Sequence, residues 1–118
     1  LKALQFGALR MAPAFWAGVA EAGGLDPGFA RTGRLMPLPD GRAVAAARER
    51  EAAAGTLWQG VGAWRVEAAP SGWGPASATG LVVRDTLAAR LAPRRALAAL
   101  AAAIRARGGE IVRNGPVE

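Results

Sequence analysis

Few side chains in this sequence are suited to chemistry, and those present form no recognisable catalytic pattern. Histidine, cysteine and tyrosine are absent, which removes the commonest general base, the thiolate nucleophile and the phenolic acid. Carboxylates are sparse, and Glu49 and Glu51 should face different sides of a helix, so they form no acid–base pair. We therefore predict neither a catalytic residue nor a metal site within the chain.

Two pairs of residues are candidates for ligand binding. Arg94 and Arg95 stand together at a predicted helix start, where a bound anion would offset their unfavourable interaction with the helix dipole. The interpretation that we favour is that both side chains lie along the surface. Trp58 and Trp64 are candidates to line a ligand pocket, although we expect them to fill the core instead. The glycines form no G-x-G-x-x-G phosphate loop between a strand and a helix.

The composition is that of one globular domain with a basic surface. The chain has 118 residues, a net charge of +6 and a pI near 11.6. Its arginines are scattered along the sequence, so we expect solubility charges and no nucleic-acid partner. A small basic module that binds a protein or nucleic acid is the alternative. We expect a cytoplasmic protein, since no apolar run approaches the roughly 18 residues of a membrane span and no signal pattern opens the chain.

The best-defined element is a helix that begins at Pro93, because proline suits the first helical position. Leu97, Leu100, Ala101 and Ile104 recur at three- and four-residue spacing, which predicts that they form the buried stripe. Gly108 and Gly109 should end this helix. A short strand over residues 110–113 is predicted to follow.

The N-terminal half is predicted to contain two helices and one strand. A helix over residues 1–22 carries an apolar stripe, and Pro13 should kink or split it. A strand over residues 30–38 should lie at a sheet edge, because prolines remove backbone donors. Asp40 is a suitable N-cap for a helix over residues 41–54.

The middle of the chain is predicted to be mostly strand. One strand covers residues 56–68, a loop over 69–76 follows with Trp73 packed against the body, and a second strand covers 78–84. Beyond it the chain either turns at Asp85 and returns as a strand over 87–91, or begins the long helix at Asp85 with a kink at Pro93. We favour the turn. Asn114 to Pro116 should form another turn, with a new strand from Val117.

These elements predict an α+β fold in which helices flank an antiparallel sheet, with a final helix–strand unit of the kind found in α/β domains. The chain opens with Leu1 and not Met, and the strand predicted at Val117 has no room to pair. We therefore expect an excised piece of a longer protein. Such a piece is expected to self-associate through exposed apolar surface.

The run from Leu91-Ala-Pro-Arg-Arg through Ala99-Leu100 to Arg107-Gly-Gly-Glu-Ile111 resembles the FAD-dependent oxidoreductases of the D-amino-acid oxidase and glycine oxidase superfamily. In that family a Pro-headed helix is followed by a Gly-rich turn, an Ile-containing strand and a Val. Upstream, Thr32-Gly-Arg-Leu35, an Ala/Arg/Glu-rich helix and a strand–loop–strand stand in the family's order. The family often has Asp before the Pro, where this chain has Ala92.

The resemblance implies that residues 1–90 are part of a substrate-side α+β domain and that residues 91–118 return to a Rossmann-like FAD domain. It also implies that Val117 makes a backbone contact to FAD. The parent protein would oxidise the C–N bond of an amine or amino acid by hydride transfer to FAD. The fragment alone would bind no FAD and be inactive, because the family's glycine-rich FAD fingerprint and C-terminal substrate contacts have no counterpart here.

Overall fold

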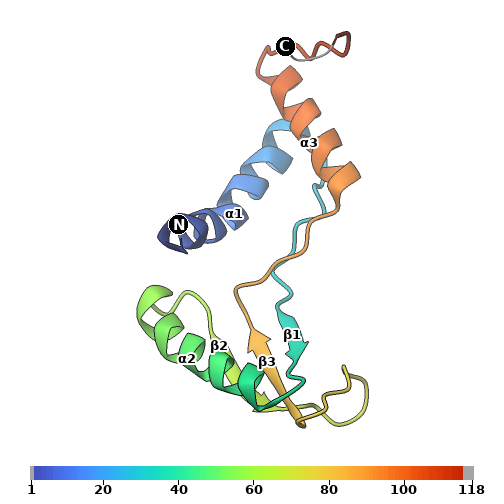
Figure 1. Ribbon diagram of the computed structural model, residues 1–118. Helices are drawn as coiled ribbons and strands as arrows, with labels where there is room; N and C mark the ends of the chain where they lie inside the picture. The colour runs from blue at the N-terminus through green and yellow to red at the C-terminus, as the bar shows by residue number, and fades with distance from the viewer. Residues whose placement is uncertain (1, 116–118) are drawn as a thin grey trace. The chain divides into compact units, whose positions relative to one another are not determined.

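The computed structural model describes residues 2–115, which fold into three helices and one three-stranded sheet (Figure 1). The α+β fold with an antiparallel sheet and flanking helices is therefore confirmed. The elements in chain order are α1 (Lys2–Gly23), β1 (Arg34–Pro37), α2 (Gly41–Leu57), β2 (Trp64–Ala68), β3 (Leu81–Asp85) and α3 (Pro93–Ala106).

The described residues form two compact units. The sheet unit contains residues 2–10 and 31–89, which include the start of α1, all three strands and α2. The helical unit contains residues 11–30 and 90–115, which include the remainder of α1 and all of α3. That residues 1–90 and 91–118 belong to domains with different roles stays a prediction.

The sheet has the order β1-β3-β2, and both pairings with the central strand β3 are antiparallel. The register places Val83 between Met36 and Val66. One face of the sheet packs against α2, where Leu38, Ala47 and Val83 form a buried cluster. The core of this unit thus lies between β3 and α2, and alternation along the strands supplies its apolar side chains.

Helix α2 begins as its sequence predicts but ends later. The Asp40 carboxylate accepts a hydrogen bond from the Ala43 backbone N–H at 2.8 Å, which is the geometry of a helix N-cap. The helix continues past residue 54 to Leu57, so the first part of the strand predicted over residues 56–68 is wrong. Gln59 and Gly60, with φ of 49° and 78°, reverse the chain. Strand β2 therefore begins only at Trp64.

The remaining strand predictions are partly correct. Pro37 ends β1, which pairs only with β3 and is the edge strand that the prolines predict, although it is shorter than residues 30–38. The strand predicted over 78–84 is confirmed as β3. Trp73 is fully exposed, so its predicted packing against the body is wrong. The end of the loop between β2 and β3 is held instead by Thr79, whose hydroxyl donates a hydrogen bond to the Leu38 carbonyl at 2.7 Å.

The chain turns at Asp85, as the favoured interpretation predicts. The Asp85 carboxylate accepts hydrogen bonds from the backbone N–H groups of Leu87 and Ala88, at 2.9 and 3.1 Å. The alternative helix start at Asp85 is wrong, because α3 begins at Pro93. The returning strand over residues 87–91 is also wrong, because only an isolated bridge between Ala30 and Arg90 forms there.

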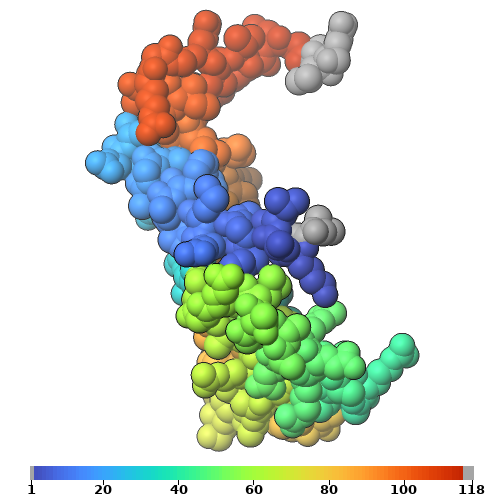
Figure 2. All heavy atoms as spheres, turned by 90° about the vertical axis from the view of Figure 1, so that its left-hand side faces the viewer, coloured from blue at the N-terminus to red at the C-terminus, as the bar shows by residue number. Residues whose placement is uncertain are grey.

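In the helical unit the small side chains of α3 make the contact with α1. Ala99 and Ala103 pack against Val19 in the second half of α1, and the two helices lie side by side (Figures 1 and 2). The predicted buried stripe of α3 is therefore only partly correct, since Leu100 packs against this cluster but Leu97 and Ile104 are 69 % and 43 % exposed. Close approach of the two backbones is the reason, because only small residues fit at such a contact.

The stripe predicted along the first helix is also only partly buried. Val19 is buried, whereas Leu4, Met11 and Phe15 are exposed. Helix α1 runs through Pro13 without a break, so of the two predicted outcomes, a kink or a split, the split is wrong. Pro13 has no N–H to offer the Leu9 carbonyl, and the Arg31 guanidinium donates to that carbonyl instead.

The end of α3 follows its sequence pattern, but the element expected after it is not formed. Gly108 takes a φ of 81° directly after the helix, as a terminating glycine does. The strand predicted over residues 110–113 is wrong, because these residues form no regular secondary structure. The strand predicted from Val117 lies outside the described residues. Within residues 2–115, no helix combines the length and apolar character required to cross a membrane.

Candidate functional site

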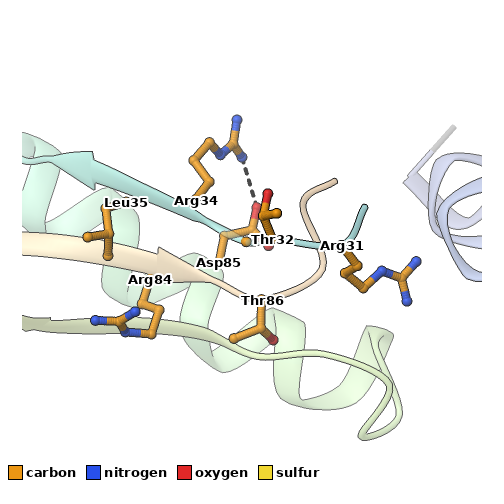
Figure 3. A pocket seen from close by; sticks show the side chains of 8 residues that line it. Arg31, Thr32, Arg34, Leu35, Arg84, Asp85 and Thr86 are labelled. Carbon is orange, nitrogen blue, oxygen red and sulfur yellow. Dashed lines mark hydrogen bonds and ion pairs between the residues drawn. The ribbon is translucent and has the colours of Figure 1, made fainter. Parts of the chain in front are cut away.

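The ends of β1 and β3 enclose an open hollow of about 420 Å³ that carries three arginines (Figure 3). Their guanidinium groups point away from one another and are engaged elsewhere. Arg34 pairs with Asp85 at 2.9 Å, Arg84 pairs with Glu67 at 2.5 Å, and Arg31 donates to the Leu9 carbonyl. A phosphate or carboxylate site needs donors that converge on one point. This hollow therefore provides no anion site.

Asp85 is the buried acidic residue of the same hollow, and its contacts give it a structural role. One carboxylate oxygen accepts the two backbone N–H groups of the turn, while the other accepts the Arg34 guanidinium. The adjacent Thr86 hydroxyl accepts a hydrogen bond from the Ala63 N–H at 2.7 Å. Both side chains are used to join the end of β3 to its surroundings. Neither is free to act on a substrate.

A second hollow lies between the start of α1 and the last turns of α2, and it has a different character. We call it the tryptophan pocket; its volume is about 300 Å³. Its main lining side chains are Lys2, Phe6, Leu9, Arg50, Leu57, Trp58 and Trp64. The first turns of α1 lie against the end of α2 in the space-filling view (Figure 2). The volume is at the lower end of the range for small-molecule sites.

The two indole rings of this pocket are held in fixed positions. Their centroids are 6.3 Å apart and their planes meet at 82°, an edge-to-face arrangement. The Trp64 Nε1–H donates to the Ala47 carbonyl at 3.1 Å. The Trp58 backbone N–H donates to the Ala54 carbonyl at 2.9 Å and so continues the bonding of α2. We predicted that Trp58 and Trp64 fill the core. Both also line a cavity, so that prediction describes only part of their role.

The tryptophan pocket carries positive charge and no acidic counterpart. The Arg50 guanidinium carbon lies 5.9 Å from the Trp64 ring centroid, a cation–π contact. Lys2 is the other cation, and no aspartate or glutamate is among the described residues that line the pocket. Of these residues, only the two tryptophans were predicted from the sequence; Phe6 and Arg50 were not. Spacing of Arg50, Ala54 and Leu57 by three and four residues is the signal that places them on one helix face.

The less favoured interpretation of Arg94 and Arg95, a bound anion, is not supported by the geometry. The Arg95 guanidinium pairs with the Asp26 carboxylate. The Gly28 backbone N–H, which donates to the other Asp26 oxygen at 2.7 Å, is the main cause that lowers the pKa of Asp26, and Arg95 lowers it further. Arg95 thus fastens the 25–28 turn to the start of α3. Its charge is satisfied within the chain.

Within the part of the chain that the structure describes, no set of side chains is suited to hold a metal ion or FAD. Residues 2–115 contain no cluster of three potential metal ligands, and Glu49 and Glu51 belong to none. The described residues also do not fit FAD, because the arginines of the strand-end hollow diverge and no glycine-rich loop joins a strand to a helix N-terminus. Val117, which the resemblance assigns to FAD, lies outside the described residues.

No protein-family model, curated protein or solved structure matches this chain. The likeness to the D-amino-acid oxidase superfamily therefore rests on the residues quoted above and stays a prediction.

Proposed function

We propose that this chain is the central section of an FAD-dependent oxidoreductase of the D-amino-acid oxidase and glycine oxidase superfamily. In this proposal the sheet unit belongs to the substrate-side domain, and α3 belongs to the domain that binds FAD. The parent protein oxidises the C–N bond of an amine or amino-acid substrate by hydride transfer to the flavin. In this proposal the section itself binds no FAD and has no activity, because the FAD fingerprint and the substrate contacts belong to other parts of the parent protein.

The observation that carries the proposal is the helix α3 together with its flanks. The helix begins at Pro93 and is terminated at Gly108, and these are the positions that the family motif assigns to a helix start and stop. The preceding Ala92 makes no side-chain cap, in keeping with the missing Asp of that motif. The helix and its two ends thus agree with the motif, including the point of departure at Ala92, whereas the strand that the motif places after the glycines is not formed.

The exposed face of α3 gives independent support. Leu97 and Ile104 are seven residues apart and therefore share one side of the helix, and both are exposed while the alanine side is covered. In α/β domains a helix covers a sheet with its larger apolar side chains. A sheet packed on the Leu97–Ile104 face would bury them. This is the arrangement that the proposal requires of a helix in an FAD domain.

The chemistry of the chain points in the same direction. It has no histidine, cysteine or tyrosine, and its buried carboxylate, Asp85, is used in a turn. An enzyme with so few side chains suited to catalysis in this region would rely on a bound cofactor to supply the reacting atoms. We propose no nucleic-acid function, because the arginines that would carry it are separated, and Arg34, Arg84 and Arg95 are paired with carboxylates.

The test is to express the whole reading frame that encodes this chain and to purify its product. We expect visible flavin absorption that is bleached under anaerobic conditions by a D-amino acid, glycine or a secondary amine. The 118-residue chain purified in the presence of FAD serves as the control and should remain colourless. A folded product without flavin would overturn the flavoprotein proposal. A flavin that a nicotinamide reduces but no amine does would overturn the substrate class.

A further inference from the structure

We propose that the tryptophan pocket of the sheet unit binds a small aromatic carboxylate. The inference is independent of the flavoprotein proposal, because the pocket lies wholly within this chain and no step of the flavin reaction uses it. It rests on three properties of the pocket: an apolar cavity, aromatic walls that are already in place, and a positive charge without an acidic partner among its described lining residues.

The cavity suits a ligand of the size of one aromatic ring with a short side chain. Its volume of about 300 Å³ is enclosed mainly by Phe6, Leu57 and the two indoles. A ring inserted here would contact aromatic faces and edges, which attract one another beyond simple burial. A larger ligand, such as a dinucleotide, exceeds the space available.

The walls need no rearrangement to receive such a ring. Trp64 is fixed by its strand, by its bond to the Ala47 carbonyl and by the edge contact of Trp58. Binding therefore costs little ordering of side chains, which is the main advantage of a preorganised site.

The positive charge of the pocket determines which polar group a bound ligand should carry. Arg50 lies over the Trp64 ring, and Lys2 lines the same pocket. A carboxylate is attracted to both cations, whereas an amide of the same shape gains no ionic interaction. An aromatic cation is disfavoured by like charge. The pocket should therefore distinguish an acid from its own amide.

The experiment titrates the 118-residue chain with phenylacetate and follows the indole N–H signals of its four tryptophans by NMR. We expect the signals of Trp58 and Trp64 to shift and saturate, with a dissociation constant of roughly millimolar order for so small a ligand. Trp16 belongs to the helical unit and Trp73 is fully exposed, so their signals should stay in place. Phenylacetamide is the matched neutral ligand and should bind more weakly.

Two variants and one control sharpen the test. Arg50→Gln should weaken phenylacetate binding by about threefold to tenfold and leave phenylacetamide unchanged, as expected for removal of one cation at a partly exposed site. Trp58→Ala should weaken both ligands by roughly tenfold through loss of an aromatic wall. Arg48→Gln alters an exposed arginine of the same helix that does not line the pocket, and should have no effect.

The inference is overturned by any of three results: no saturable shift at Trp58 and Trp64, equal shifts at all four tryptophans, or equal affinity for the acid and its amide. Circular dichroism of each variant verifies that it is folded. Should Trp58→Ala fail to fold, the comparison of acid with amide and the Arg50→Gln variant still decide the question.

Discussion

The two units of this chain are built on opposite packing rules. The best-buried side chains of the sheet unit are large apolar ones, Val82, Val83 and Leu87, which are almost wholly inaccessible to solvent. In the helical unit the best-buried side chains of α3 are small, since Ala99 and Ala103 are buried and Leu97 is exposed. A contact between small residues brings two helices close together but removes little apolar area from water. The helical unit is therefore the one whose own core contributes less to stability, and Phe15, Leu97 and Ile104 remain on its surface.

Removing one leucine from each unit should give the largest contrast. Leu87 is 1 % exposed, so Leu87→Ala should reduce the free energy of unfolding by about 2–5 kcal/mol through lost burial and a cavity. Leu97→Ala removes the same atoms from an exposed site and should change it by less than about 0.5 kcal/mol. Urea denaturation of both variants measures the difference. A loss of similar size at Leu97 would mean that α3 is covered in solution, for example by self-association.

The small-residue contact can be disrupted at Gly23, at the end of α1. A Cβ atom there would lie 2.7 Å from the Ala103 backbone nitrogen and 2.8 Å from the Ala102 Cβ atom, which neither helix can accommodate without moving apart. Gly23→Ala should therefore destabilise the helical unit by about 1–3 kcal/mol.

Gly18→Ala is the matched control on the same helix, because nothing lies within 4 Å of a Cβ atom at that position. It should stabilise by about 0.4–1 kcal/mol through reduced freedom of the unfolded chain. Thermal unfolding of the two variants measures both effects. Shifts of the melting temperature in the same direction would contradict the close contact between α1 and α3.

This contact also explains what was and was not predictable from the sequence. Pro93, Asp40 and Gly108 act within a few residues of themselves, so the starts of α2 and α3 and the end of α3 were predictable, whereas the end of α2 was not. Periodicity correctly identified α3 as a helix, yet the side that it buries depends on a partner helix far away in the sequence. The leucine stripe was the expected choice because it offers more apolar area. The glycine at residue 23 makes the alanine side fit instead.

Strand boundaries and the tryptophan pocket were less predictable because they too depend on segments that are far apart in the sequence. Alternation over residues 56–63 resembles a strand, but α2 continues to Leu57 and the Gln59–Gly60 reversal prevents pairing there. Pairing partners decide where a strand exists, and they are absent from local sequence. The pocket combines the start of α1, the end of α2 and Trp64 of β2. Only the tertiary structure brings these three segments of the sheet unit together.

A smaller effect is expected from the hydrogen bond of Arg31 to the Leu9 carbonyl, which replaces a helical hydrogen bond that α1 lacks. The Arg31 guanidinium serves the Leu9 carbonyl that Pro13 leaves without a helical donor. Arg31→Met should cost about 1 kcal/mol, since a carbonyl loses its partner. In the background of Pro13→Ala, which restores the helical N–H, the same substitution should cost less. A double-mutant cycle by chemical denaturation measures this coupling, and additive effects would separate the arginine from the proline.

The smallest effect belongs to the exposed turn at Asp26 in the helical unit. The pKa of this carboxyl is lowered from its ordinary value of 3.8 in the folded chain, first by the Gly28 N–H and then by Arg95. The stabilisation from this lowered pKa is present above pH 3.8 and is lost as the pH falls through the folded value.

Asp26→Asn keeps an oxygen for Gly28 but removes the charge. The stability of the wild type should therefore exceed that of Asp26→Asn at neutral pH and converge with it in acid, as urea denaturation across pH will reveal. A difference that persists unchanged below pH 3.8 would assign the effect to the shape of the turn, whereas convergence assigns it to the carboxylate that joins the turn to α3.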